Sequence, residues 1–171
     1  TLIIAGSDNG GEAGMQADIK ACAAMGSFST TAFTVLTAQN TRCFKDLFFI
    51  PLEWIENQID SVMQDFRVDC VKTGMLGNPD IALLIARKLK EYNVKNYVCD
   101  PCIYCRSGDT LMTPDTIPVV KSELIPLAII ITPNYKEACT LLDYRIPRTI
   151  EGIKKAACEL KDLGCQNVYL K

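Results

Sequence analysis

Residues 4–20, IAGSDNGGEAGMQADIK, decide the fold of this chain. The stretch begins as a short apolar strand, turns through several glycines and continues with the spacing of a helix. Backbone N–H groups gather at such a turn, and the lack of bulky side chains lets a small ligand approach the chain. An ordinary strand-to-helix turn without a ligand gives the same local pattern, so both interpretations stay open.

The turn differs from the two common nucleotide-binding loops. Gly6 and Gly11 have the spacing of a Walker A loop, but Glu12 follows where that loop has lysine. Only Gly11 and Gly14 fit a dinucleotide-binding fingerprint. Asp8 and Glu12 place negative charge beside the N–H groups, which disfavours phosphate. We therefore expect the turn to bind a neutral polar molecule, with Gly6 and Gly11 among the substrate-binding residues.

Short apolar runs alternate with helical patterns along the whole chain. The expected strands are 2–5, 31–36, 69–72, 97–99, 128–131 and 168–170, and the expected helices are 13–25, 51–66, 79–92, 114–123, 135–142 and 150–163. Uniformly apolar strands alternating with helices are typical of a doubly wound α/β fold, with a mostly parallel sheet and helices on both faces. We expect a single domain over residues 1–171.

Composition and charge exclude several classes of protein. The 171 residues are 49% hydrophobic, which is enough for a substantial core. Eighteen Lys and Arg face 20 Asp and Glu, so no basic surface for nucleic acid is expected. The sequence contains no apolar stretch of the length that a membrane span needs, and we expect a cytoplasmic protein.

The absence of histidine restricts the chemistry further. With no His in the sequence, a Ser-His-Asp triad, a Cys-His pair and an imidazole base cannot be built. The nine cysteines are interpreted mainly as buried thiols in a reducing compartment. Cys102 and Cys105 form a C-x-x-C pattern, but a zinc site would need further ligands, and a redox pair is expected to begin a helix.

Polar loops follow the expected strands. Ligands of doubly wound sheets bind outside the carboxyl ends of the strands, so these loops are the expected site. After the glycine turn, they comprise residues 37–41, 73–77, 100–109 and 132–137, all rich in Gly, Pro, amides or charge. Their convergence would form a polar pocket with an apolar floor.

These loops carry a family resemblance. The segments GSDNGGEAGMQADIK, TVLTAQNT, VKTGMLG, CDPCIYCRSGDTLMTPD and ITPNYKEA occur in this order in the sequence. In order and spacing they resemble the hydroxymethylpyrimidine and hydroxymethylpyrimidine-phosphate kinases of thiamin biosynthesis, which are ribokinase-like enzymes. The resemblance implies ATP-dependent phosphorylation of an aminopyrimidine and its monophosphate, with Mg²⁺. Pyridoxal kinases share the fold, but generally lack the Ala-Gln-Asn-Thr segment, so pyridoxal phosphorylation is the alternative.

Four further residues are candidates for binding the pyrimidine. The Gln39 amide offers a donor and an acceptor on one plane, which suits an aminopyrimidine edge, although a turn amide is the alternative. Asp18 follows Gly14 on one helical face, where a ligand can approach its carboxylate unless a lysine pairs with it. Met75 and Cys102 would form soft apolar walls, or could be core residues; the family more often has Val at position 102.

Four other residues are candidates for the phosphate and nucleotide site. Asn134 and Glu137 match the Asn-x-x-Glu that, in the family, organises Mg²⁺ and water, so Glu137 would hold the metal indirectly. Asn134 could instead cap a helix. Arg106 stands where the family usually has Lys, and Lys171 matches the lysine of a Lys-Gly-Gly stretch. Exposed surface charge is the alternative for both.

The sequence departs from the family at its end. Family members continue beyond the position of Lys171 to a Gly-Thr-Gly-Cys or Gly-Thr-Gly-Asp loop, which forms the anion hole and holds the catalytic residue. No residue of the 171 matches that residue, so no catalytic residue is assigned and the chain alone is expected to be inactive. We expect a homodimer with a small-molecule pyrimidine as substrate. A catalytically inactive binding or dimerisation module is a further alternative.

Overall fold

The computed structural model describes residues 1–105 and 108–171, and within them five strands form a sheet in which all neighbours are parallel. The strand order is β2-β1-β5-β6-β7. The strands are β1 (Leu2–Ala5), β2 (Thr30–Phe33), β5 (Val71–Thr73), β6 (Tyr97–Cys99) and β7 (Ile130–Ile131). The expected doubly wound α/β fold with a parallel sheet is confirmed.

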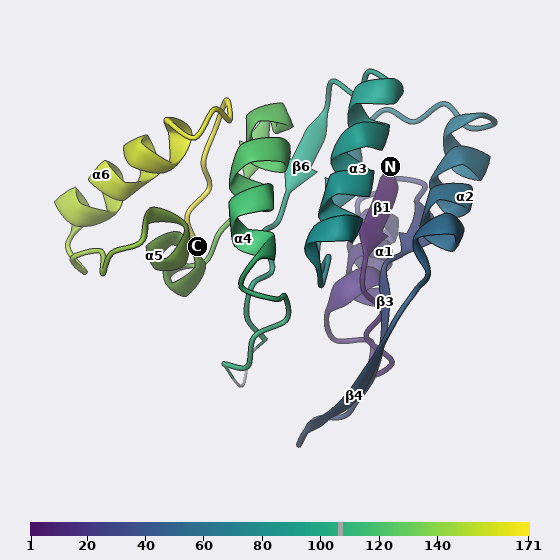
Figure 1. Ribbon diagram of the computed structural model, residues 1–171, viewed down its shortest axis with the longest axis horizontal. Helices are drawn as coiled ribbons and strands as arrows, with labels where there is room; N and C mark the ends of the chain where they lie inside the picture. The colour runs from purple at the N-terminus through teal and green to yellow at the C-terminus, as the bar shows by residue number, and fades with distance from the viewer. Residues whose placement is uncertain (106–107) are drawn as a thin grey trace.

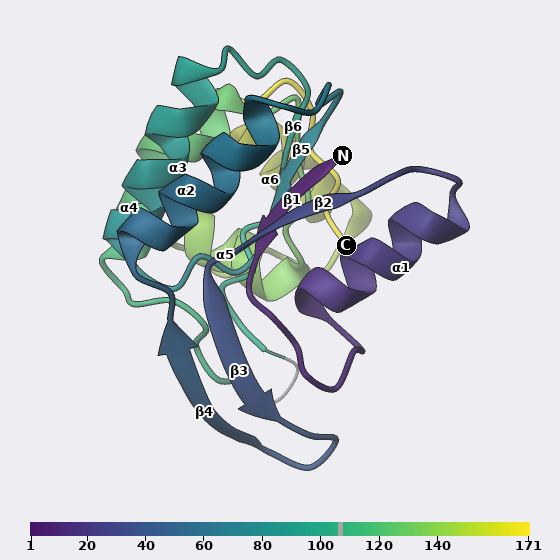
Figure 2. The same ribbon diagram turned by 90° about the vertical axis from the view of Figure 1, so that its right-hand side faces the viewer.

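Helices cover both faces of this sheet. Figure 2 shows α1 on one face and α2, α3 and α4 on the other, and Figure 1 shows α5 and α6 on the side of β6 that lies away from β1. The helices are α1 (Gly14–Ala24), α2 (Leu52–Met63), α3 (Pro79–Glu91), α4 (Thr116–Val119), α5 (Tyr135–Leu142) and α6 (Ile150–Lys161). None of the helices in the described parts of the chain is long and apolar enough to cross a membrane.

Strand β1 explains why the apolar runs do not alternate with polar residues. Leu2 and Ile4 point into the large core, whereas Ile3 and Ala5 point into a smaller cluster with Met15 of α1. All of these side chains are buried. Because both faces of the strand are covered, every position favours an apolar residue.

An antiparallel hairpin extends from the end of the sheet at which β1 and β2 finish (Figure 2). It consists of β3 (Val35–Gln39) and β4 (Phe44–Phe49). The expected continuous strand 31–36 is therefore wrong, because the chain changes sheets at Thr34. The buried Thr34 hydroxyl donates to the Met75 carbonyl at 2.6 Å, and its N–H donates to Ala5 O at 3.1 Å. The expected loop 37–41 is likewise wrong, since residues 37–39 belong to β3.

Strands β5 and β7 begin two residues later than the expected strands 69–72 and 128–131, and two other elements differ in kind from expectation. Residues 168–170 form only an isolated bridge, between Val168 and Ile131, because β7 itself is short. The expected helix 114–123 begins at Thr116, and after Val119 it widens into a π-helical turn, Val120–Leu124, followed by a 3₁₀ turn, Ile125–Leu127. Pro126 lacks an N–H and so cannot continue a regular α-helix.

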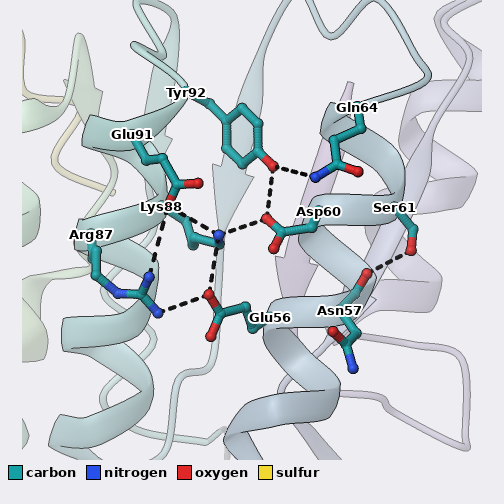
Figure 3. A network of polar contacts seen from close by, with 9 residues as sticks. All are labelled: Glu56, Asn57, Asp60, Ser61, Gln64, Arg87, Lys88, Glu91 and Tyr92. Atoms are coloured by element: carbon teal, nitrogen blue, oxygen red, sulfur yellow. Dashed lines mark hydrogen bonds and ion pairs between the residues drawn. The ribbon is translucent and has the colours of Figure 1, made fainter.

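A network of charged side chains joins α2 to α3 (Figure 3). Lys88 is only 3% exposed, and its Nζ lies 2.7 Å from Asp60, 3.0 Å from Glu91 and 3.1 Å from Glu56. Burial alone would lower the pKa of Lys88, but these carboxylates outweigh it and raise that pKa. Arg87 adds a second cation, 3.0 Å from Glu56. The network therefore holds the two helices together through a buried ammonium group.

We predict that Lys88→Met destabilises the protein by about 1 to 3 kcal/mol at pH 7, because it removes the charge-assisted hydrogen bonds of three partly exposed carboxylates. The pKa of Asp60 is lowered, with burial opposing and Lys88 and Tyr92 favouring ionisation. The difference from wild type should therefore shrink as the pH falls below about 4, where the carboxylates become protonated. Urea unfolding of both proteins at pH 7 and below pH 4 measures this difference in the free energy of unfolding.

Lys90→Met is the matched control for Lys88→Met. Lys90 lies on the same helix and pairs with Glu123 at 2.8 Å, but its side chain is 55% exposed. Exposed pairs contribute about 0 to 1 kcal/mol, so this variant should remain close to wild type. Equal losses in the two variants would contradict the assignment of a stabilising role to the buried network.

Candidate functional site

The loops after the parallel strands lie side by side at one edge of the sheet. Gly74 N–H donates to Ile4 O at 3.0 Å, Asp100 N–H to Thr73 O at 3.1 Å, and Thr132 N–H to Cys99 O at 3.1 Å. Each bond links the start of one loop to the end of the neighbouring strand. The loops after β5, β6 and β7 therefore begin side by side, as predicted, whereas residues 37–39 of the expected loop 37–41 belong to β3.

The glycine turn is held together by the Asp8 carboxylate. Oδ1 of Asp8 accepts from Gly10 N–H at 2.8 Å, and Oδ2 accepts from Glu12 N–H at 2.9 Å and Ala13 N–H at 2.8 Å. Asp8 is only 4% exposed. The expectation that the N–H groups of the turn gather to receive a ligand is therefore wrong for these positions, because Asp8 already occupies them.

The electrostatics of Asp8 follow from these contacts. Burial alone would raise the pKa of Asp8, but hydrogen bonds from the Gln39 side chain and from backbone N–H groups outweigh burial and lower that pKa. The carboxylate therefore remains ionised and acts as the centre of the turn.

Gly14 is required for backbone packing. A Cβ on Gly14 would lie 2.6 Å from the carbonyl oxygen of Gly6, and Gly14 has φ +55°. The space left by the missing side chain at Gly14 is thus filled by the Gly6 carbonyl, so the expectation that this space admits a ligand is wrong. Gly11, with φ +76°, lies within the turn, where its carbonyl accepts from Lys20 Nζ at 2.7 Å.

The β3–β4 hairpin brings Gln39 to the glycine turn. Gln39 N–H donates to Asn9 Oδ1 at 2.8 Å, and Thr37 Oγ1 donates to Ser7 O at 2.7 Å. Gln39 is partly buried, and its side chain hydrogen bonds to Asp8. The hairpin thus places the planar amide of Gln39 beside the turn, where an aminopyrimidine edge could pair with it.

Asp18 and Met75 approach the turn from other elements. The Asp18 carboxylate pairs with Lys72 Nζ of β5 at 2.5 Å, which is the lysine pairing considered as the alternative for this residue. Met75 is buried, and its Sδ would lie 3.1 Å from a Cβ placed on Gly6. The absence of a side chain at Gly6 therefore makes room for Met75 to pack against the glycine turn.

The second half of the site lies after β6 and β7. Lys171 Nζ lies 3.3 Å from Asp100 Oδ1. Cys102 has a left-handed φ of +47°, and burial, followed by the negative charges of Asp100 and Glu137, raises the pKa of its thiol to about 12. The positive charges of Lys72 and Lys171 oppose that rise. We refer to these five groups as the charged cluster, because the charges of the other four all act on the Cys102 thiol.

Asn134 and Glu137 form a capping box at the start of α5. Asn134 Oδ1 accepts from Glu137 N–H at 3.0 Å, while Glu137 Oε2 accepts from Asn134 N–H at 2.8 Å and Oε1 from Ile103 N–H at 2.9 Å. Burial raises the pKa of Glu137, and these N–H groups oppose the rise. The helix-cap alternative for Asn134 is confirmed as a structural role. Arg106 lies outside the described residues.

Three residues of the site were missed from the sequence. Lys72 was included in an expected strand, although a lysine inside an apolar strand is itself a signal. Asp8 was interpreted only as a negative charge that weakens phosphate binding. Asp100, the first residue after β6, has the position in which doubly wound sheets place ligand-binding groups.

The surface also has a hollow that lies away from the loops described above. A hollow lined by Met63, Val68, Asp69 and residues 92–96 opens at the amino ends of β5 and β6. This hollow lies at the edge of the sheet opposite to the charged cluster. The site is therefore assigned from its contacts and charges.

We predict that Asp8→Asn destabilises the protein by about 1 to 3 kcal/mol at pH 7, because the amide keeps one acceptor oxygen and leaves a buried N–H unpaired. The pKa of Asp8 is lowered from 3.8, so its contribution is present above that value and is lost as the pH falls through the lower folded value. Urea unfolding at pH 7 and pH 3 should show the difference narrowing in acid.

Asp65→Asn serves as the control for Asp8→Asn, because Asp65 is exposed after α2. It should leave stability unchanged at both pH values. A loss of stability in Asp8→Asn that grows in acid would contradict the sign of the pKa shift.

Comparison with known proteins shows that the chain is similar to a family of kinases. A family model described as phosphomethylpyrimidine kinase matches residues 8–171. The hydroxymethylpyrimidine/phosphomethylpyrimidine kinase of Escherichia coli is 38% identical over 170 residues, covering 99% of this chain and 64% of that protein. The chain thus spans less than two thirds of the length of this curated relative.

Solved structures agree with this placement. A crystal structure of phosphomethylpyrimidine kinase from Clostridium difficile has a TM-score of 0.93 and 38% identity, covering 99% of this chain and 73% of that one. The structure of the pyridoxal kinase from Staphylococcus aureus, in complex with AMP-PCP and pyridoxal, has a TM-score of 0.88 and 31% identity. The similarity covers 99% of this chain and 61% of that one. Both similarities extend over nearly the whole chain.

Proposed function

Because the chain belongs to the phosphomethylpyrimidine kinase family, we propose that the protein containing it uses ATP to phosphorylate 4-amino-5-hydroxymethyl-2-methylpyrimidine and its monophosphate. This activity would serve thiamin biosynthesis. The observation that supports it most is the match of the family model to residues 8–171, a range that includes all the proposed site residues except Gly6.

The site has a suitable arrangement of groups for such a substrate. We assign the pyrimidine to the half formed by Gly6, Gly11, Gln39 and Met75, with Asp18 and Cys102 at its border. The Gln39 amide would pair with the ring nitrogen and the exocyclic amine, and Met75 would pack against the ring. The hydroxymethyl group would then point toward the cluster of Asp100 and Lys171.

The nucleotide would occupy the half of the site after β6 and β7. Lys171, 3.3 Å from Asp100, is a cation able to interact with phosphate, and Asn134 borders the same region. Both Glu137 oxygens already accept backbone N–H groups, so this carboxylate suits Mg²⁺ held through water better than direct coordination. Mg-ATP would supply the phosphoryl group and neutralise its charge. Arg106 keeps its proposed role on the sequence resemblance alone.

Pyridoxal phosphorylation is the second candidate, because the Staphylococcus aureus pyridoxal kinase has a TM-score of 0.88 to this chain. With full-length protein and Mg-ATP, we predict a higher kcat/KM for the pyrimidine than for pyridoxal, since pyridoxal lacks the amine that pairs with Gln39. Gln39→Leu should weaken pyrimidine binding by about 1 to 3 kcal/mol and affect pyridoxal less.

A competition assay and calorimetry measure both parts of this prediction. Gln166→Leu is the control, because Gln166 is exposed and lies before residues 168–170, at the opposite end of the sheet. Preference for pyridoxal by the wild type would favour the second candidate. Equal pyrimidine affinity in wild type and Gln39→Leu would remove Gln39 from the site.

The activity of residues 1–171 alone is a separate proposal. The loop expected from the family resemblance to hold the catalytic group is not part of these residues, so we predict little phosphate transfer by them. Loss of an anion hole alone typically costs about a hundredfold to a thousandfold in kcat. Assays of this chain beside full-length protein test the prediction. Equal rates would place the catalytic group within the chain, and inactivity of both would favour a binding module.

We also propose a cytoplasmic homodimer. Apolar side chains on the hairpin and the start of α2 support self-association, since Phe48 is 61% exposed and Trp54 64% exposed. Sedimentation equilibrium of the full-length protein gives its oligomeric state directly.

A further inference from the structure

Lys72 occupies an unusual position for a lysine. It lies on β5, the middle strand in the sheet order, where it pairs with Ile3 of β1 and Val98 of β6. Val71 and Thr73 on either side of it are buried. Central strands of parallel sheets are covered on both faces, so a lysine here requires a partner for its charge.

The Lys72 side chain reaches forward, toward the carboxyl end of its strand. A Cβ placed on Gly74 would lie 3.2 Å from Lys72 Nζ and 3.1 Å from the Ala5 side chain. The amine therefore lies over Gly74, which is the first residue of the loop after β5. Since Gly74 has no side chain, the amine reaches the edge where the site loops meet.

At that edge, the amine meets Asp18 of α1. Nζ lies 2.5 Å from Asp18 Oδ2, and the side chains of Lys72 and Asp18 are 21% and 26% exposed. A charge-assisted bond at a partly buried position fixes the carboxylate more firmly than an exposed pair would. Oδ1 of Asp18 accepts no hydrogen bond from any residue that the structure describes, so it can receive a donor from a ligand.

The neighbouring charges support this location for the amine. The negative charges of Asp100 and Glu137 raise the pKa of the Cys102 thiol, and the positive charges of Lys72 and Lys171 lower it. The Lys72 amine therefore acts on the same thiol as the other members of the charged cluster. Lys171 pairs with Asp100 at the nucleotide half, whereas Lys72 pairs with Asp18 at the pyrimidine half. Each half therefore contains a lysine paired with a carboxylate.

We propose that Lys72 is a positioning residue, which holds Oδ2 of Asp18 so that Oδ1 faces the substrate and accepts a hydrogen bond from its amine or hydroxyl. This inference rests on the proposed function. An ion pair that serves only to attach α1 to the sheet would change stability and leave ligand affinity unchanged. Affinity and stability must therefore be measured on the same variants.

A double-mutant cycle in the full-length protein tests the proposal. Calorimetry with hydroxymethylpyrimidine gives Kd for wild type, Lys72→Met, Asp18→Asn and the double variant, and thermal unfolding gives their stability. We expect each single change to raise Kd about tenfold, and the double change to raise it by nearly the same factor. A hundredfold rise in the double variant, or unchanged Kd in Lys72→Met, would overturn the proposal.

Further variants separate positioning from folding. Lys72→Arg keeps a cation that can pair with Asp18 and should recover most of the lost affinity. Lys90→Met, at an exposed pair on α3, should bind like wild type. If Lys72→Met does not fold, Gly74→Ala provides the test, because its methyl group displaces the amine while both charges remain. Gly74→Ala should also raise Kd about tenfold, and wild-type affinity in that variant would overturn the proposal.

The proposal that the substrate is the pyrimidine can be rejected while the role of Lys72 is still tested. If the wild type prefers pyridoxal, the same cycle is run with pyridoxal, whose hydroxyl groups can also donate to Asp18 Oδ1. Coupled changes in Kd for pyridoxal would then support the role of Lys72 while the proposed substrate is rejected. Independent changes would reject the role of Lys72.

Discussion

Parallel pairing of β1 on both of its edges is the constraint on which the site depends. Strand β1 pairs with β2 along Leu2 to Ala5 on one side and with β5 along Leu2 to Ile4 on the other. All four side chains of β1 are buried. Because the strands run in one direction, their carboxyl ends and the following loops meet at one edge. The apolar strands thus fix the positions of the polar groups that follow them.

Charge at this edge is balanced by local pairing. Asp8 is ionised and satisfied by backbone N–H groups, Asp18 pairs with Lys72, and Asp100 pairs with Lys171. Buried or partly buried charges without such partners would be costly. Each of the two ion pairs joins residues far apart in sequence, and Asp18 and Lys72 lie on α1 and β5, which the sheet holds in place. A polar ligand entering this edge therefore meets groups that are already oriented.

The sequence was most informative where the local pattern and the tertiary structure agree. Leu2–Ala5, Tyr97–Cys99 and Tyr135–Leu142 have the predicted bounds. Prediction failed at Thr34, a β-branched residue that continues the strand pattern in the sequence. In the structure its N–H donates to Ala5 O and its hydroxyl donates to Met75 O, and the chain passes there from one sheet to the other. β4 was missed because its mostly exposed residues show no buried face. The role of Gly14 required the contact with Gly6 O, which no local pattern contains.

A crystal structure of the full-length protein with bound hydroxymethylpyrimidine tests the central claim most directly. The account predicts the ring at the carboxyl ends of β1 and β5, with its amine and ring nitrogen on the Gln39 amide, its face on Met75 and a donor on Oδ1 of Asp18. Density for the ligand in the hollow lined by residues 92–96, at the amino ends of the strands, would contradict the account.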